Sequence, residues 1–190
     1  MTNPKLSIAL VQDNATVVDL KLNIAKIKDH IAGNLTADLI VFPEMFLTGY
    51  PLGDLVTRPS FLADVGRELR DLLEFVIWTD GPAILVGAPQ PGDGMPYNSA
   101  WLMEPSGAMR VVRKTELPNA DVFDERRTFS SHEGQNLPLH FKGFNLGIMI
   151  CEDMWHGRVA RNLADELADV LIAVNGSPFH IGKHAERIRH

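Results

Sequence analysis

Apolar residues recur at helical spacing in two segments of the chain. In the first segment, four apolar residues follow one another at intervals of four, three and four, which places them in one stripe along a helix. Gly33 and Asn34 come next, and these residue types commonly end a helix. A second segment carries a similar stripe, and a shorter helix is expected near Val159–Leu167. The stripes consist of Leu20, Ile24, Ile27 and Ile31, and of Leu62, Val65, Leu69, Leu72 and Val76.

Short apolar runs bounded by turn residues predict strands around these helices. Leu39–Phe42 is continuously apolar and ends at Pro43, the pattern of a strand buried on both faces. The turn residues Pro105-Ser106-Gly107 join two further strands. The predicted strands are Lys5–Gln12, Leu39–Phe42, Ala83–Ala88, Asn98–Met103, Met109–Lys114, Leu137–Phe141, Phe144–Ile150 and Val170–Val174. Their order mixes strand–helix–strand units with antiparallel neighbours, which predicts an α/β fold class.

The composition fits one globular domain over residues 1–190, with 45% apolar residues to build a core. The net charge is −6 and no run of basic residues interrupts the acidic balance, which argues against a nucleic-acid or membrane-surface partner. No apolar run is long enough for a transmembrane helix, and the N-terminus has no signal-peptide pattern. The single cysteine, Cys151, excludes an intrachain disulfide and a cysteine-based zinc site. We therefore expect a cytoplasmic location.

Three predicted strand ends carry reactive side chains: Glu44, Lys114 and Cys151. Each has an ordinary structural alternative, as a capping or solvated glutamate, a solvated lysine and a buried, inert cysteine. Long irregular segments, Phe46–Arg58 and Thr115–Asn136, lie close after the first two, and loops of this length are often functional. Together, an acid, an ammonium and a thiol are chemically complete for amide cleavage. The carboxylate can remove the thiol proton and later protonate the leaving amine, while the ammonium stabilises the oxyanion.

Motifs around these residues resemble those of a known superfamily. The segments Phe42–Pro51, Arg113–Asn119, Val122–Arg127 and Cys151–Trp155 are similar to the nitrilase, or carbon–nitrogen hydrolase, superfamily. Within it, Cys151–Trp155 and Ser177–Lys183 resemble the glutaminase domains of glutamine-dependent NAD⁺ synthetases. Four motifs in the family's order make the resemblance specific. It extends from Leu6 to the end of the chain.

The resemblance implies a nitrilase-like α-β-β-α sandwich with mixed sheets and a triad of Glu44, Lys114 and Cys151. Cys151 would attack the side-chain amide of L-glutamine and form a thioester, releasing ammonia. Glu44 would act as the general base and then as the general acid. Lys114 and the backbone N–H of Glu152 would hold the oxyanion. Glu125 matches a second family glutamate that supports the lysine and the deacylating water.

The resemblance also assigns a substrate pocket and a partner. Tyr50, Phe123, Ser177 and Lys183 match positions at which the family lines its glutamine pocket. In the family's full-length enzymes, the ammonia passes to a separate ATP-dependent synthetase domain, which amidates nicotinic acid adenine dinucleotide. No phosphate-binding glycine loop occurs in this sequence, so we expect no cofactor here; ATP and magnesium are expected only in that absent domain.

Two features depart from the family pattern. Ala120 stands where the family usually has an aromatic residue of the pocket wall. The chain ends at His190, whereas the family's domain continues, so we expect a fragment with an incomplete C-terminal part of the fold. Exposed sheet edges and apolar faces in such a fragment would favour a homo-oligomer.

Two alternative functions stay open. A free-standing amidase of the same superfamily would act on another small amide, and a scaffold module would keep the fold without activity. His180 and His184 are four residues apart, but a helix would have to span Gly182 for them to share a face, and no third ligand is evident. Ordinary polar histidines are therefore the better interpretation, and we expect no metal site.

Overall fold

The computed structural model describes residues 5–119, 123–178 and 181–189. Its larger sheet has five strands in the order β1-β2-β3-β4-β5. The first three are parallel, and β4 runs antiparallel to both β3 and β5. The strands are β1 (Ile8–Leu10), β2 (Leu39–Val41), β3 (Ala83–Gln90), β4 (Tyr97–Met103) and β5 (Met109–Arg113).

The smaller sheet has the order β6-β7-β8, in which β7 pairs antiparallel with β6 and parallel with β8. Its strands are β6 (Leu139–Phe141), β7 (Phe144–Ile150) and β8 (Val170–Val174). The described chain also contains the helices α1 (Leu20–Gly33), α2 (Pro59–Thr79), α3 (Gly157–Asp165) and α4 (Lys183–Arg189). Short 3₁₀ helices occur at η1 (Gly53–Thr57), η2 (Glu125–Arg127) and η3 (Cys151–Trp155).

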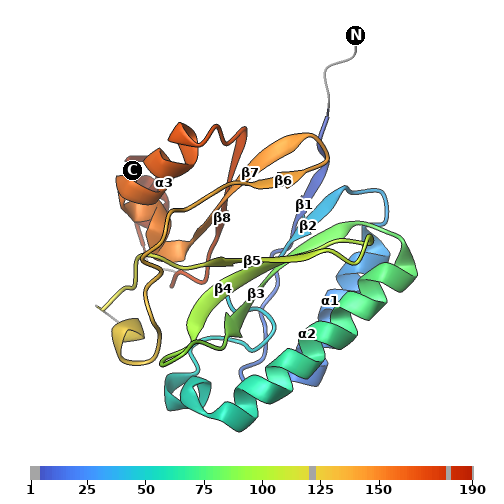
Figure 1. Ribbon diagram of the computed structural model, residues 1–190, viewed down its shortest axis with the longest axis horizontal. Helices are drawn as coiled ribbons and strands as arrows, with labels where there is room; N and C mark the ends of the chain where they lie inside the picture. The colour runs from blue at the N-terminus through green and yellow to red at the C-terminus, as the bar shows by residue number, and fades with distance from the viewer. Residues whose placement is uncertain (1–4, 120–122, 179–180, 190) are drawn as a thin grey trace.

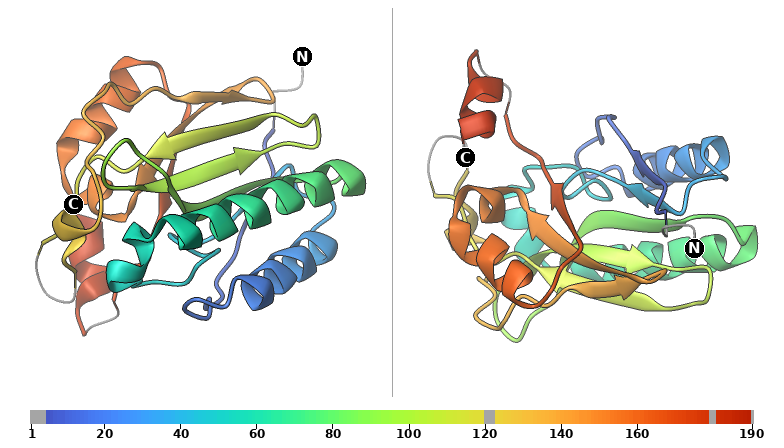
Figure 2. Two further views of the ribbon diagram at one scale, coloured as in Figure 1. Left: turned by 60° about the horizontal axis from the view of Figure 1, so that its bottom comes forward. Right: turned by 90° about the horizontal axis from the view of Figure 1, so that it is seen from above.

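The two sheets pack face to face, and helices cover their outer faces (Figures 1 and 2). Along β2 the side chains alternate between two cores. Ile40 packs with residues of α1 and α2, whereas Leu39 and Val41 belong to the core between the sheets. This explains why the strand is apolar throughout. Because α3 covers the smaller sheet through Val159 and Leu163, the layers form the predicted α-β-β-α sandwich.

The predicted helices and strands are confirmed, with shifts at their ends. The first strand is shorter than Lys5–Gln12 because its partner β2 offers only three paired residues. The third helix begins at Gly157, before the predicted Val159. The sequence pattern missed α4 and the three 3₁₀ helices, which have no apolar stripe of their own. Gly182, at a φ of 91°, directly precedes α4, so His184 lies in a helix that starts after the glycine; His180 lies outside the described residues.

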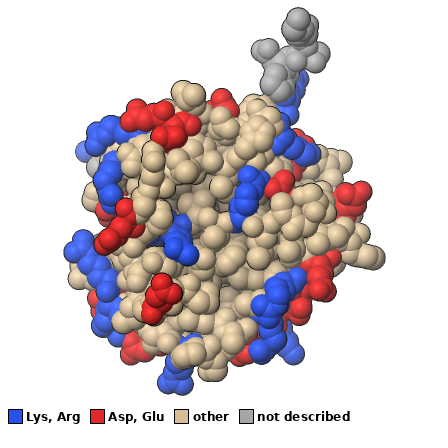
Figure 3. All heavy atoms as spheres, viewed as in Figure 1, with Lys and Arg blue, Asp and Glu red and all other residues tan. Residues whose placement is uncertain are grey.

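The surface is mixed in charge. Figure 3 shows acidic and basic side chains interspersed over one face, with tan apolar and neutral residues between them. Among the described helices, none combines the length and the apolar character needed to cross a lipid bilayer.

Candidate active site

The segment after β2 brings Glu44 against β3. Met45 has a φ of 52°, so the chain turns sharply here. Gly87 of β3 permits this turn, since a Cβ at position 87 would lie only 2.2 Å from the backbone nitrogen of Met45. The backbone N–H of Leu47 donates a 3.1 Å hydrogen bond to the carbonyl oxygen of Gly87. A glycine on one strand thus lets the neighbouring segment insert the Glu44 side chain, which is fully buried, into the site.

Lys114 follows β5 and meets two carboxylates. Its backbone N–H donates to the carbonyl oxygen of Asn98 at 2.8 Å, which continues the β4–β5 pairing by one residue. Its side chain is 1% exposed. The Nζ atom lies 2.7 Å from Oε1 of Glu44 and 2.8 Å from Oε2 of Glu125, which η2 supplies. The structure therefore brings residues from three separate segments into one buried ionic cluster.

Cys151 begins η3 directly after β7 and has a φ of 45°, a conformation that residues other than glycine seldom adopt. Its Sγ atom lies 3.4 Å from Oγ of Ser177, in the segment after β8. This sharp turn holds the thiol at the junction between β7 and η3. Ser177, which the resemblance assigned to the pocket, is thus next to the candidate nucleophile.

Asp153 fastens this turn to the loop that follows Lys114. Its carboxylate accepts backbone N–H groups from Ile150 at 2.9 Å, Thr115 at 3.1 Å and Glu116 at 2.7 Å. Burial raises the pKa of Asp153 to about 6, although these hydrogen bonds lower it. The sequence motif contained Asp153 without indicating this role, because the two bonded loops are distant in sequence.

Asn98 is a second residue that the sequence analysis missed. Its Nδ2 atom donates to Oε1 of Glu44 at 2.8 Å and to Oε1 of Glu125 at 2.9 Å. The hydroxyl of Tyr50 donates to the same Glu125 oxygen at 2.6 Å. A signal for Asn98 was present, because the predicted hairpin about Pro105-Ser106-Gly107 places it opposite Lys114.

Burial and neighbouring charges together set the pKa values of the cluster. Burial alone lowers the pKa of Lys114, but the charges of Glu44 and Glu125 outweigh it, so this pKa is raised and the ammonium is retained. Burial raises the pKa of Glu125 above its usual range, although Lys114 opposes that rise. The pKa of Tyr50 is raised by burial first and by Glu125 second, which keeps its hydroxyl protonated as a donor.

The thiol of Cys151 is protonated at neutral pH. Burial and then the negative charge of Glu44 raise its pKa to about 12, while Lys114 acts in the lowering direction. A thiol is a weak nucleophile and a thiolate a strong one, so attack on a substrate requires a base that takes this proton. The charge of Glu44 acts on the pKa of this thiol, and the role of Glu44 as that base stays a prediction.

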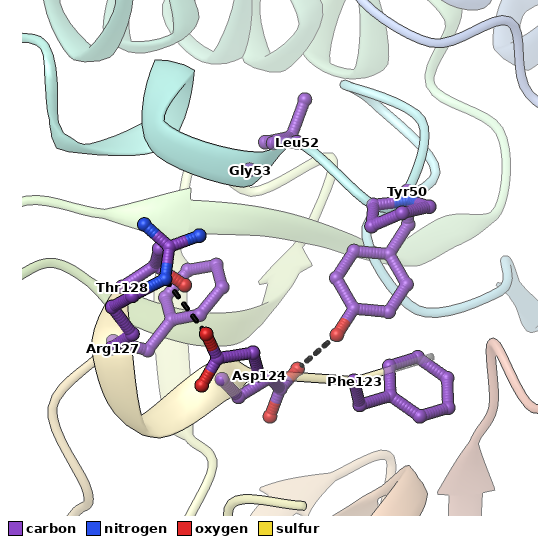
Figure 4. Close-up of a pocket in the computed structure, with 10 residues that line it drawn as sticks. Tyr50, Leu52, Gly53, Phe123, Asp124, Arg127 and Thr128 are labelled. Atoms are coloured by element: carbon purple, nitrogen blue, oxygen red, sulfur yellow. Dashed lines mark hydrogen bonds and ion pairs between the residues drawn. The ribbon is translucent and has the colours of Figure 1, made fainter. Parts of the chain in front are cut away.

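Two hollows adjoin the cluster and share Tyr50. The first, of about 190 Å³, is lined by residues that include Tyr50, Phe123 and Glu125. The dashed line at the Tyr50 hydroxyl in Figure 4 marks its hydrogen bond to Glu125. The rings of Tyr50 and Phe123 are stacked with centroids 5.5 Å apart. The second, of about 250 Å³, includes Glu44, Tyr50 and Ser177 in its lining. Each hollow is large enough for a small amide.

The sequence analysis also named Lys183, Glu152 and Ala120. Lys183, at the start of α4, places its Nζ 4.5 Å from the ring centroid of Trp155, the last residue of η3. The side chain of Glu152 contacts Nε2 of His156 at 3.0 Å, and an oxyanion role for its backbone N–H stays a prediction. Ala120 lies outside the described residues. Within the described ranges, no three His, Cys, Asp or Glu side chains are grouped to hold a metal ion.

This sandwich places a thiol after β7, an ammonium after β5 and carboxylates after β2 and on η2, an arrangement that fits the carbon–nitrogen hydrolases. Residues 7–188 match the family model described as carbon–nitrogen hydrolase. The chain belongs to this family.

Several relatives and solved structures are similar to the chain. The glutamine-dependent NAD(+) synthetase of Xanthomonas campestris pv. campestris is 35% identical over 98% of this chain, and that of Rhodobacter capsulatus 40% over 94%. The chain spans 34% and 32% of those two proteins, about one third of their length.

Solved structures agree with this fold. A glutamine-dependent NAD⁺ synthetase from Acinetobacter baumannii, in complex with ADP, superposes with a TM-score of 0.84 at 31% identity, over 96% of this chain and 34% of that one. An amidase from Nesterenkonia sp. superposes with a TM-score of 0.83 at 21% identity, over 94% of this chain and 68% of that one, and so shares the fold.

Proposed function

We propose that the chain is a glutamine amidohydrolase that releases ammonia from L-glutamine through a thioester on Cys151. The observation that carries the proposal is the buried cluster in which Lys114 contacts both Glu44 and Glu125, beside a thiol at the end of β7. The relatives named glutamine-dependent NAD(+) synthetases support glutamine as the amide.

In the first half-reaction, the Cys151 proton passes to Glu44 as the sulfur–carbon bond forms. Lys114 has three N–H donors, and two of them face Glu44 and Glu125, so the third remains for the oxyanion of the tetrahedral intermediate. The N–H of Glu152 is proposed as the second oxyanion donor. When the carbon–nitrogen bond breaks, Glu44 returns its proton to the leaving nitrogen, and ammonia departs.

In the second half-reaction, water attacks the thioester carbonyl. As the carbon–oxygen bond forms, a carboxylate of the cluster removes a proton from the water. The carbon–sulfur bond then breaks, the sulfur takes up this proton, and glutamate and the free thiol result. Glu125 is the proposed support for this water, since it lines the same hollow as Tyr50 and Phe123. Ser177 and Lys183 complete the proposed substrate-binding set.

The wider role follows from the relatives. We propose that the ammonia feeds ATP-dependent amidation of nicotinic acid adenine dinucleotide to NAD⁺ in a synthetase domain of a longer protein. ATP and magnesium are assigned to that domain, and none of the site residues above is assigned to them. A cytoplasmic location and self-association stay predictions, as does the assignment of residues 1–190 to one domain.

A free-standing amidase acting on another small amide is the second candidate, favoured by the fold shared with the Nesterenkonia amidase. The test measures ammonia release from L-glutamine and from acetamide and propionamide, beside the Cys151→Ala variant. Cysteine-dependent release that is selective for glutamine supports the first proposal, and selectivity for the aliphatic amides supports the second. Absence of release from every amide, together with no labelling of Cys151 by a glutamine-analogue electrophile, would indicate the scaffold alternative.

A further inference from the structure

The side-chain amide of Asn98 connects the two carboxylates of the site. Asn98 lies on β4, is 0% exposed, and each of its two Nδ2 hydrogens serves one carboxylate, Glu44 at 2.8 Å and Glu125 at 2.9 Å. Its backbone carbonyl accepts the N–H of Lys114 at 2.8 Å. One residue of the strand is therefore bonded to three of the four candidate catalytic residues.

The orientation of this amide is determined by its neighbours. Oδ1 of Asn98 is buried, and within the part of the chain that the structure describes it has no hydrogen-bond partner. A rotation of the amide by 180° would direct this oxygen, an acceptor, at two carboxylates, which are also acceptors. A buried, unpaired carbonyl is unfavourable. In the observed orientation the amide therefore gives both N–H donors to the carboxylates, while its own Oδ1 has no partner among the described residues.

The hydrogen bonds of Glu44 then indicate which of its oxygens reacts. Oε1 accepts from Lys114 and from Asn98, which uses both of its lone pairs. Among the described residues, Oε2 accepts one bond, from the backbone N–H of Gly176 at 2.8 Å, which leaves it a lone pair. A Cβ at position 176 would lie 3.0 Å from this oxygen, so a glycine leaves room for it.

We infer that Asn98 is a positioning residue, whose amide fixes Glu44 and Glu125 in their side-by-side arrangement and leaves Oε2 of Glu44 as the proton acceptor for Cys151. The inference rests on the proposed glutaminase function for its catalytic consequence. Its geometric part, the hydrogen bonds by which Asn98 holds the two carboxylates and acts on the ionisation of Glu125, does not depend on which amide is the substrate.

The expected signature of this role is a change in the pH dependence of ammonia release and of Cys151 alkylation. The groups that face the two carboxylates are Lys114 after β5, Tyr50 after β2 and Cys151 after β7, and these remain in an Asn98 variant. Removal of Asn98 deletes one hydrogen bond from each carboxylate, and for Glu125, whose pKa burial already raises, protonation then begins at higher pH. A bond of this charge-assisted kind corresponds to a shift of about one pH unit.

The experiment compares Asn98→Ala with Ser99→Ala, a control at the next residue of β4, which is equally buried and points to the opposite face of the sheet. Two profiles are measured between pH 4.5 and 9: kcat/KM for ammonia release from L-glutamine, and the rate of Cys151 alkylation by iodoacetamide without substrate. In Asn98→Ala we expect the acid limb of both profiles to move up by about one pH unit, and kcat to fall roughly tenfold with little change in KM.

Unchanged acid limbs in Asn98→Ala, or an equal shift in Ser99→Ala, would overturn the inference. Near-UV circular dichroism verifies the fold, and Asn98→Ser, which keeps one donor, replaces the alanine variant if that variant does not fold. Asn98→Asp is expected to lose more activity than Asn98→Ala, since it places a third carboxyl group against the other two. If no amide is hydrolysed, the proposed function fails, while the alkylation profile still decides the coupling.

Discussion

Gly87→Ala tests whether the position of Glu44 depends on the strand beside it. The added Cβ would lie 2.2 Å from the nitrogen of Met45, 2.8 Å from the carbonyl carbon of Glu44 and 2.9 Å from its Cα. All three are backbone atoms, so no flexible side chain can rotate away. Real Cβ atoms essentially never approach a neighbour below 3.0 Å, so the segment carrying Glu44 must move by roughly 1 Å.

A displacement of this size has two measurable consequences. Overpacking of a well-packed region costs about 1–3 kcal/mol, which lowers Tm by about 2–12 °C in a chain of this length. A misplacement of about 1 Å of a catalytic group can reduce the rate about 10²-fold. We therefore expect Gly87→Ala to fold, to melt at a lower temperature and to release ammonia from L-glutamine about 10²-fold more slowly.

The assay pairs thermal unfolding with ammonia release, and Gly33→Ala serves as the matched control. Gly33 ends α1, and a Cβ there would meet no atom within 4 Å. Its substitution should leave both quantities near those of the parent protein. Activity of Gly87→Ala equal to that of Gly33→Ala would refute the claim that close backbone packing on β3 positions the base.

Further predictions concern the ionic cluster and its supports. Cys151→Ala should abolish ammonia release. Glu44→Gln should lose at least ~10²-fold in kcat at unchanged fold, because Glu44 is the base proposed to take the thiol proton; near-normal turnover of Glu44→Gln would contradict this assignment. Lys114→Met should lose a comparable factor through the oxyanion. Its destabilisation should be greatest at high pH, where Glu125, whose pKa burial raises, is ionised without its partner; urea unfolding at pH 5 and pH 8 measures this, and equal losses at both would contradict it. Asp153, whose pKa is raised to about 6 in the fold from an ordinary 3.8, stabilises the fold most below pH 4 and loses that contribution, about 3 kcal/mol, as the pH rises through 6. Asp153→Asn should flatten the pH dependence of unfolding between pH 4 and 6, and a slope unchanged from the parent would argue against this account.

The elements of the fold could be read from the sequence because they depend on local periodicity. The stripe of Ile24, Ile27 and Ile31 specifies α1, and the apolar run Leu39–Val41 specifies a strand with no solvent-facing side. The strand ends also follow from local pattern, which is why Glu44, Lys114 and Cys151 could be singled out. α4 lacks such a stripe and was missed.

What the sequence alone left undecided is which groups meet. Asn98 donates hydrogen bonds to carboxylates 54 and 27 residues away, and Asp153 accepts backbone N–H groups from residues 38 and 37 positions before it. Gly87 matters because the segment that follows a different strand packs against it. These relations arise only when the strands are paired in register. Periodicity indicates on which face of its helix or strand each residue lies. Hydrogen bonds and close contacts between distant segments depend on how these elements pack together, and here that packing determines which residues form the site.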